Sequence, residues 1–430
     1  MRGTLQSLMS VLLGIGLVLF ARADSVDVVL GPFTAPGQWR FSHVDAFPIP
    51  LTPPYWITGF SVEMLDAGGN PLGHDTVHLH HTLVGNLARS SLPGSLWGSF
   101  YEIFMGAGHE LVPVQFPTGY GYYVASGDML AYQVEIMSMT GSDVPGVYIV
   151  YHIDYTRQPQ RHLRPFWMSA VSGFEYDVPP GGNRGGGEDI RSRQWTMPVS
   201  GRIFGLLPHL HWGGQWIELL RSSGEIIWHA DAFYHENHLH LTFWSDPDGV
   251  PVQQGERLTV RASYYNLGPD WLNDVMSLMI AMLHAPITLR GAVSLDHYAG
   301  NPSQVMVTVQ TLMPGTNTVV EQWSGALDSN GVFAFQPLRP GTYDVAVKGS
   351  HFLRKVVRGV QLSDGQTAQV QLTLINGDVD GNNRVDDADL LTVLFAFGVP
   401  GASSADITGD GRVDDSDLLT VLFRFGQVGE

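Results

Sequence analysis

Residues 207–213, Leu207-Pro208-His209-Leu210-His211-Trp212-Gly213, carry the most informative short pattern in the chain. Alternate side chains of an extended strand lie on one face, so His209 and His211 can reach the same metal ion. Imidazole binds copper, zinc, iron and nickel alike, so this pair alone leaves the metal open. The pattern predicts a metal-binding strand.

Three other stretches extend the prediction from one site to two. They are His78-Leu79-His80-His81, His152 in Val150-Tyr151-His152, and Met276 in Asp274-Val275-Met276. The expected ligand sets are all-histidine in the first site and two histidines with a thioether in the second: His80, His81 and His152, then His209, His211 and Met276. A thioether is a soft ligand that favours Cu(I), so the second set indicates copper.

Several assignments remain open at this point. In a flat strand His78 shares a face with His80, whereas the neighbours His80 and His81 do not, so His78 is a substitute ligand. Met279 and Met282 are rivals of Met276 in the same apolar run. A further cluster, His235, His238 and His240, fits a metal on spacing alone, and His109 is expected near a site without binding.

The composition indicates a globular β-rich protein. The chain has 430 residues, is 44% hydrophobic and contains 50 Gly and 26 Pro, which favours many turns. A net charge of −18 argues against nucleic-acid partners. The chain has no cysteine, so neither disulfides nor thiolate ligands are available.

The N-terminus resembles a secretory signal peptide over residues 1–23. Arg2 supplies the positive charge, residues 8–20 form a largely apolar run, and Ala21-Arg22-Ala23 fits a cleavage site. The apolar run is short for a membrane span. We therefore expect a secreted, periplasmic or cell-surface protein.

Changes in pattern divide the remainder into four segments, 24–160, 161–286, 287–375 and 376–430. Short strands separated by Gly/Pro turns fill the first two, with a polar break near residues 156–165. Segment 287–375 lacks metal-type clusters, and its short strands predict a small β-sandwich of the immunoglobulin or prealbumin-like kind.

The last segment contains an internal repeat, because residues 384–398 recur as residues 412–426 with two differences. Oxygen-bearing side chains fall at positions 1, 3, 5 and 12 of two twelve-residue loops, the spacing that calcium needs. These expected calcium ligands are Asp378, Asp380, Asn382 and Asp389 in the first loop, and Asp406, Thr408, Asp410 and Asp417 in the second. Each loop is followed by an expected helix.

This repeat resembles a dockerin module, which implies docking to a cohesin-like or cell-surface partner. Two positions depart from the pattern, because Asn383 replaces the usual Gly of the first loop and Thr408 is a weak ligand. A purely structural pair of calcium-bound loops is an equally open interpretation.

The metal motifs, in their order over residues 77–284, resemble the copper type II, ascorbate-dependent monooxygenases, the family of peptidylglycine hydroxylase and dopamine β-monooxygenase. The resemblance implies two tandem antiparallel β-sandwich, jelly-roll-like halves with one copper each. The copper of His80, His81 and His152 would deliver an electron. The copper of His209, His211 and Met276 would activate O2 and abstract hydrogen from a C–H bond of a small-molecule substrate, with ascorbate or another reductant.

Departures from the family concern the substrate. Leu207, Leu278 and Ile280 stand where peptide-amidating members carry Arg, Asn and Tyr, so a peptide carboxylate is not the expected ligand. The alternative from another class is a non-catalytic copper-binding or surface-interaction protein on the same fold. A zinc hydrolase using Glu110 or Glu236 as base is disfavoured, because the sequence lacks His-Glu-x-x-His.

Overall fold

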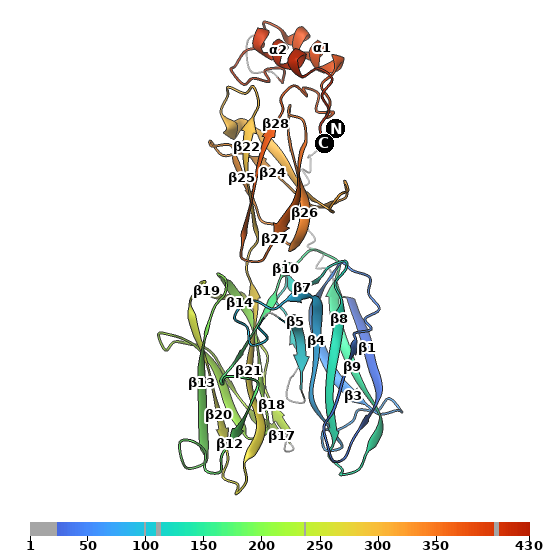
Figure 1. Ribbon diagram of the computed structural model, residues 1–430, viewed down its shortest axis with the longest axis vertical. Helices are drawn as coiled ribbons and strands as arrows, with labels where there is room; N and C mark the ends of the chain where they lie inside the picture. The colour runs from blue at the N-terminus through green and yellow to red at the C-terminus, as the bar shows by residue number, and fades with distance from the viewer. Residues whose placement is uncertain (1–23, 99, 109–112, 236–237, 400–403) are drawn as a thin grey trace, which may run out of the picture.

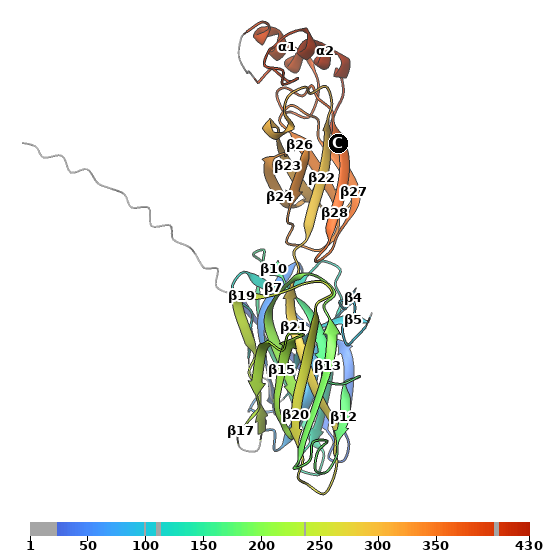
Figure 2. The ribbon, with the colours of Figure 1, turned by 90° about the vertical axis from the view of Figure 1, so that its left-hand side faces the viewer.

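The computed structural model describes residues 24–98, 100–108, 113–235, 238–399 and 404–430. Within them the chain forms three two-sheet β units and a small helical unit (Figure 1). The first two β units lie side by side, the third continues from one end of the pair, and the helices lie at the far end (Figures 1 and 2). The predicted fold class, mainly β sandwiches followed by a small helical module, is confirmed. The predicted signal peptide lies outside the described residues.

The first sandwich packs the sheet β1-β9-β3-β7-β10, with β6 on β3, against the sheet β2-β8-β4-β5. In β8 the alternation of apolar and polar residues explains this packing, because Val134 and Ile136 are buried in the core while Gln133 and Glu135 point to the other face. The strands are β1 Asp24–Ala35, β2 Phe41–Ala46, β3 Tyr55–Leu65, β4 Val77–Ser90, β5 Tyr101–Ala107, β6 Val114–Gln115, β7 Tyr120–Val124, β8 Leu130–Ser138, β9 Val144–Thr156 and β10 Arg161–His162. Since β10 pairs with β7, this sandwich extends two residues past the boundary expected at 160.

The second sandwich packs the sheet β11-β21-β14-β19, with β12 on β21, against β13-β20-β15-β16, and carries the hairpin β17-β18. Its strands are β11 Arg164–Ser169, β12 Glu175–Val178, β13 Glu188–Thr196, β14 Gly201–Leu210, β15 Gly214–Arg221, β16 Ile226–Asp231, β17 Phe233–His235, β18 His238–His240, β19 Trp244–Val252, β20 Arg257–Tyr265 and β21 Leu272–His284.

Strand β21 is apolar along almost its whole length because it lies between two cores. Val275 and Met279 pack into the second sandwich, whereas Met276, Leu278 and Ile280 pack with the first. A strand buried on both faces needs a continuous apolar run rather than an alternating one. The two sandwiches therefore share a buried apolar interface.

The third sandwich packs β25-β22-β28 against β24-β23-β26-β27. Its elements are β22 Thr288–Leu295, the 3-10 helix η1 Pro302–Gln304, β23 Met306–Leu312, β24 Val319–Ala326, β25 Val332–Phe335, β26 Gly341–Gly349, β27 Lys355–Leu362 and β28 Thr367–Leu374. The C-terminal module contains α1 Asp387–Ala396 and α2 Asp415–Arg424. In the described part of the chain, no helix is long and apolar enough to cross a membrane.

Charged and aromatic contacts fix the third sandwich to the first two. The Arg164 guanidinium donates to the Glu102 carboxylate at 2.6 Å and lies 3.7 Å from the Asp364 carboxylate. The guanidinium of Arg339 stacks over the buried Trp56 ring, 5.0 Å from its centroid. These contacts join all three sandwiches at one junction.

Candidate metal centre

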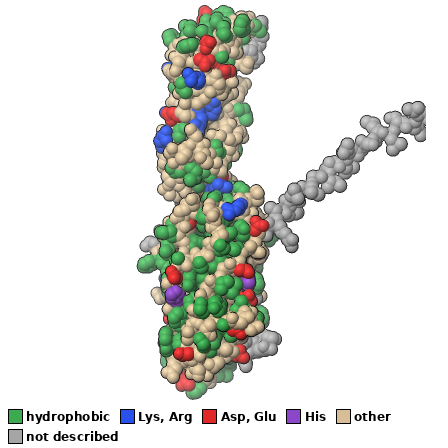
Figure 3. All heavy atoms as spheres, turned by 90° about the vertical axis from the view of Figure 1, so that its right-hand side faces the viewer, with side chains coloured by type: hydrophobic (Ala, Val, Ile, Leu, Met, Phe, Trp, Pro, Cys, Tyr) green, Lys and Arg blue, Asp and Glu red, His purple; other side chains and the backbone are tan. Residues whose placement is uncertain are grey.

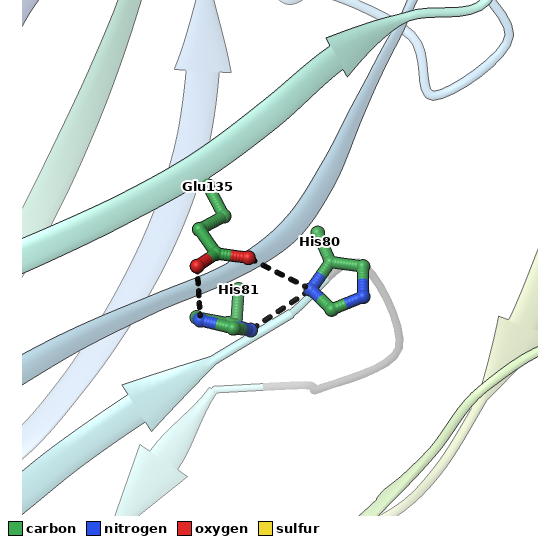
Figure 4. Close-up of side chains that lie close together, drawn as sticks. All are labelled: His80, His81 and Glu135. Carbon is green, nitrogen blue, oxygen red and sulfur yellow. Dashed lines mark hydrogen bonds and ion pairs between the residues drawn. The ribbon is translucent and has the colours of Figure 1, made fainter. Parts of the chain in front are cut away.

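A β-bulge in β4 brings His80 and His81 together, although they are neighbours in sequence. The pairing of β4 with β8 shifts register between Leu79 and His81, so one extra residue is inserted there. His80 Nδ1 consequently lies 2.9 Å from His81 Nδ1 (Figure 4). The flat-strand objection to using both residues is resolved by this bulge.

Glu135 completes a three-residue group with these histidines, as Figure 4 shows. It lies opposite His81 in the β4–β8 register. Its carboxylate oxygens are 3.6 Å from His80 Nδ1 and 3.6 Å from His81 Nε2. The three side chains are 10%, 14% and 15% exposed, so the group is largely shielded from water.

The second half supplies His209 near the end of β14, His211 just after it, and Met276 from β21. The hydroxyl of buried Tyr264 accepts the His211 N–H at 2.7 Å and donates to the Met276 carbonyl. One side chain thus fixes the backbone of both ligand-bearing segments. The rings of His209 and His211 have centroids 5.0 Å apart.

The two predicted ligand sets meet at a single place between the halves. The ring centroid of His80 lies 4.6 Å from that of His211, closer than the 4.9 Å to His81. The sequence prediction assigned these residues to two separate coppers, and the structure brings side chains of both sets close together. The imidazoles of His80, His81, His209 and His211 form one cluster across the interface.

His152, the predicted third ligand of the first copper, does not join this cluster. Its neighbour Tyr151 points into the core and bonds Thr82, so His152 points outward from the opposite sheet. Packed sheets lie about 10 Å apart, so the thickness of the sandwich separates His152 from His80 and His81. His152 contacts Asp27 at 2.8 Å and Glu63 at 3.0 Å instead.

The other candidate ligands differ in how close they lie to the cluster and its cavity. The ring of His78 lies 6.2 Å from that of His80, farther than the rings of His81 and His211. Met279 faces the core of the second sandwich, while Met276 lines a cavity together with His209. Met282 shares the face of Met276 but is not part of the cavity wall.

Burial keeps His80 in the form that binds metals. Burial, followed by the electrostatic effects of the neighbouring His211, His81 and Arg40, lowers the pKa of His80 well below its usual value. The ring is therefore neutral, which is the ligand form of imidazole. A set of buried and half-buried imidazoles that shares a cavity wall with a thioether fits copper.

A cavity of about 270 Å³ adjoins the cluster. His81 and Glu135 form part of one wall, and His209 and Met276 part of the other. The rest is mainly apolar, contributed by Leu83, Trp97, Phe174, Leu207, Leu278 and Ile280. A small apolar molecule fits this lining better than a peptide carboxylate does.

In the first predicted calcium loop, three of the four expected ligands come together. Oxygens of Asp378, Asp380 and Asp389 lie within 4.8 Å of one another. Asn383 adopts φ 71°, close to φ 92° of Gly411 at the matching position, so asparagine replaces glycine in a left-handed conformation. Burial raises the pKa of Asp378, although an ion pair with Lys348 at 2.6 Å opposes this, which fits a carboxylate needing a cation.

The second predicted loop repeats backbone hydrogen bonds of the first, in which Asp378 accepts the Asn383 N–H and Asp389 accepts the Asp380 N–H. Asp406 accepts the N–H groups of Gly409 and Gly411, and Asp417 accepts that of Thr408. The Thr408 hydroxyl is buried and has no hydrogen-bond partner among the described residues. A buried oxygen of this kind fits a calcium ligand, although the sequence marked Thr408 as weak.

Asn382 and Asp410 act on the backbone of the two loops. Asn382 Oδ1 accepts the Arg384 N–H, and Asp410 Oδ1 accepts that of Arg412. Both contacts tighten the turn that precedes each helix.

Three residues of the centre escaped sequence analysis: Glu135, Arg40 and Tyr264. The alternation of strand 130–138 places Glu135 outward, but only the register shows that it faces His81. Arg40 lies 3.0 Å from His80 Nε2, 3.4 Å from Glu135 and 3.6 Å from Glu175 of the second half. No local motif indicated these contacts.

The other candidate site residues lie in the β17-β18 hairpin or outside the described residues. The ring of His240 stacks on Phe233 in the β17-β18 hairpin. His109, Glu110 and Glu236 lie outside the described residues, as do the side chains of His235 and His238.

No protein-family model matches the chain, and no curated protein matches it. Among solved structures it is similar to a cohesin–X–dockerin complex mutant from Acetivibrio cellulolyticus, with 21% identity, 33% of this chain and 97% of that chain covered, and a TM-score of 0.27. It is also similar to the pilus 2b backbone protein of group B streptococcus (9% identity; 47% and 96% covered; TM-score 0.17) and to the major pilin subunit of Bacillus cereus (7% identity; 74% and 95% covered; TM-score 0.16). Because these TM-scores are low, the fold and the site are described from the chain's own residues.

Proposed function

We propose that the chain is an exported copper protein that holds its metal where the first two sandwiches meet. The observation that carries this proposal is the convergence of His80, His81, His209 and His211 beside Met276. Copper bound there would supply one-electron redox chemistry. The imidazoles and the thioether would hold the ion, and the surrounding apolar side chains would exclude water.

C–H hydroxylation with O2 and a reductant such as ascorbate is the second candidate function. The apolar cavity beside Met276 favours it, because a small substrate held there would lie next to the ligands. The position of His152 favours copper binding without turnover, because the expected electron-delivering set is not assembled. Copper binding is therefore the main proposal, and hydroxylation is a second proposal that requires it.

Metal analysis and oxygen uptake separate these functions. Purified chain loaded with copper is expected to retain it after gel filtration, and His211→Ala to lose the copper held by the second ligand set while its melting temperature stays unchanged. Full retention of copper by the variant would assign the metal elsewhere. Ascorbate-dependent oxygen uptake that small apolar compounds stimulate would establish the enzyme, and copper without uptake would establish the binder.

The C-terminal module is proposed to attach this copper unit to a cohesin-like or cell-surface partner. Matching residues of the two helices are exposed apolar side chains: Leu391 and Leu419, Leu394 and Leu422, and Phe395 and Phe423. Hydrophobic side chains are visible on the module's surface (Figure 3). Large apolar side chains that are exposed together are typical of a protein interface.

Calorimetry against a purified cohesin domain tests the docking role. Calcium-dependent binding that Phe395→Asp together with Phe423→Asp abolishes would support docking. Calcium binding by the module with no cohesin affinity would favour the purely structural role.

A further inference from the structure

The largely buried carboxylate beside the paired histidines of β4 has a metal-binding geometry that the sequence did not assign. We propose that Glu135, with His80 and His81, forms a two-histidine, one-carboxylate metal site in the first sandwich. This inference rests on the proposed copper function and specifies the ligand set of the first half.

Distances support three ligands around one ion. One nitrogen of each histidine and one Glu135 oxygen all lie within 4.8 Å of one another. Ligands bound to one transition metal at about 2.0–2.2 Å must lie this close together. The group can therefore receive an ion through small side-chain movements, with no change of strand register.

The Glu135 carboxylate is oriented by its own partners. One of its oxygens accepts a hydrogen bond from Gln133 Nε2 at 3.0 Å and another from Ser42 Oγ at 3.3 Å. The other oxygen faces His80 and Arg40. Carboxylates that bind a metal ion are typically oriented by such hydrogen bonds.

The Arg40 guanidinium places a positive charge beside His80 and Glu135, where a metal cation would otherwise lie. Its Nη1 lies 3.0 Å from His80 Nε2 and 3.4 Å from Glu135. The same guanidinium also reaches Glu175 at 3.6 Å and Asp274 at 3.9 Å. An arriving cation could displace Arg40 toward these two carboxylates of the second half without leaving the arginine unpaired.

The chemical consequence is a difference between the two ligand sets. A carboxylate is a harder ligand than imidazole or thioether and favours a divalent ion over Cu(I). The Glu135 set is therefore expected to prefer Cu(II) or another divalent first-row ion. The set containing Met276 is expected to prefer Cu(I).

Cu(II) titration of the full-length chain tests this assignment. In a His209→Ala background, which weakens the second set, Glu135→Gln should lower Cu(II) affinity by about ten- to a hundredfold or more. Glu135→His should restore binding and change the nitrogen hyperfine pattern in electron paramagnetic resonance. Glu63→Gln, another glutamate paired with a histidine in the same sandwich, is the matched control and should leave affinity unchanged.

The outcomes distinguish this inference from the proposed function. Glu135→Gln with unchanged affinity would overturn the Glu135 site while leaving the copper cluster intact. Failure of the unmodified chain to bind copper would overturn the proposed function, and Zn(II) binding that still depends on Glu135 would then uphold the site. Thermal melts of the metal-free variants show whether a lower copper affinity reflects a loss of folding. If Glu135→Gln lowers the melting temperature, recovery of Cu(II) binding in Glu135→His would still identify position 135 as a ligand position.

Discussion

Replacing Tyr264 by phenylalanine tests how the second half holds its metal ligands. The fully buried Tyr264 hydroxyl links the His211 N–H to the Met276 carbonyl. The variant keeps the ring and removes only this link. Each fully buried backbone group left without a partner costs about 1–3 kcal/mol. Because the bond to the His211 N–H is only partly buried, we expect the two groups together to lower the free energy of unfolding by roughly 2–4 kcal/mol.

The expected loss is large enough to measure in two independent ways. For a sandwich of this size it corresponds to a fall in Tm of roughly 10 °C. Since the same hydroxyl positions two ligand-bearing segments, Cu(I) affinity should fall by about ten- to a hundredfold in competition with a chromophoric chelator. The two readouts separate general destabilisation from loss of ligand geometry.

The neighbouring residue supplies the control. Tyr265 is 46% exposed, so Tyr265→Phe should leave both Tm and Cu(I) affinity unchanged. The reasoning would be refuted by a Tyr264→Phe variant that melts with the wild type and binds Cu(I) equally well. In that case the backbone near His211 and Met276 would be held by other contacts.

Three further predictions concern other parts of the molecule. Met276→Ile should keep the fold but weaken Cu(I) binding more than Cu(II) binding, and equal Cu(I) affinity would point to another sulfur. Burial opposes protonation of His152, but its hydrogen bonds to Asp27 and Glu63 outweigh it and raise the pKa of His152. The resulting stabilisation is present below about pH 6.5 and is lost as pH rises through the raised pKa, so the fall in Tm on moving from pH 6 to pH 9 should be smaller in His152→Gln. Copper content should not change in that variant, and its loss would return His152 to the ligand set. Calcium chelation should expose residues 376–430 to trypsin, as mass spectrometry of the fragments would show, and resistance equal to that of the calcium-loaded chain would contradict a calcium-dependent module.

Strand positions could be predicted from local patterns more readily than contacts between strands. The runs 77–84 and 258–265 lie within β4 and β20, because alternation and β-branched residues act within one strand. The two calcium loops could be proposed from local spacing alone, because all the expected ligands of a loop lie within twelve consecutive residues.

The residue that faces His80 and His81 could not be predicted in the same way. His152 and Glu135 both occupy alternating strands, and only the assignment of each strand to a sheet decides which one faces His81. A β-bulge changes which neighbours share a face, and the sequence of β4 carries no glycine at that point to mark it. Pairing register and bulges depend on the whole sheet, so they appear only in the structure.

The cavity beside the histidines has one wall from each of the first two sandwiches. A small hinge rotation would therefore change the space offered to a compound and the spacing of the metal-binding side chains together. A metal ion held by side chains of both walls would fix their spacing. Compounds that bind the metal-loaded chain and not the metal-free chain would identify molecules that need this fixed spacing.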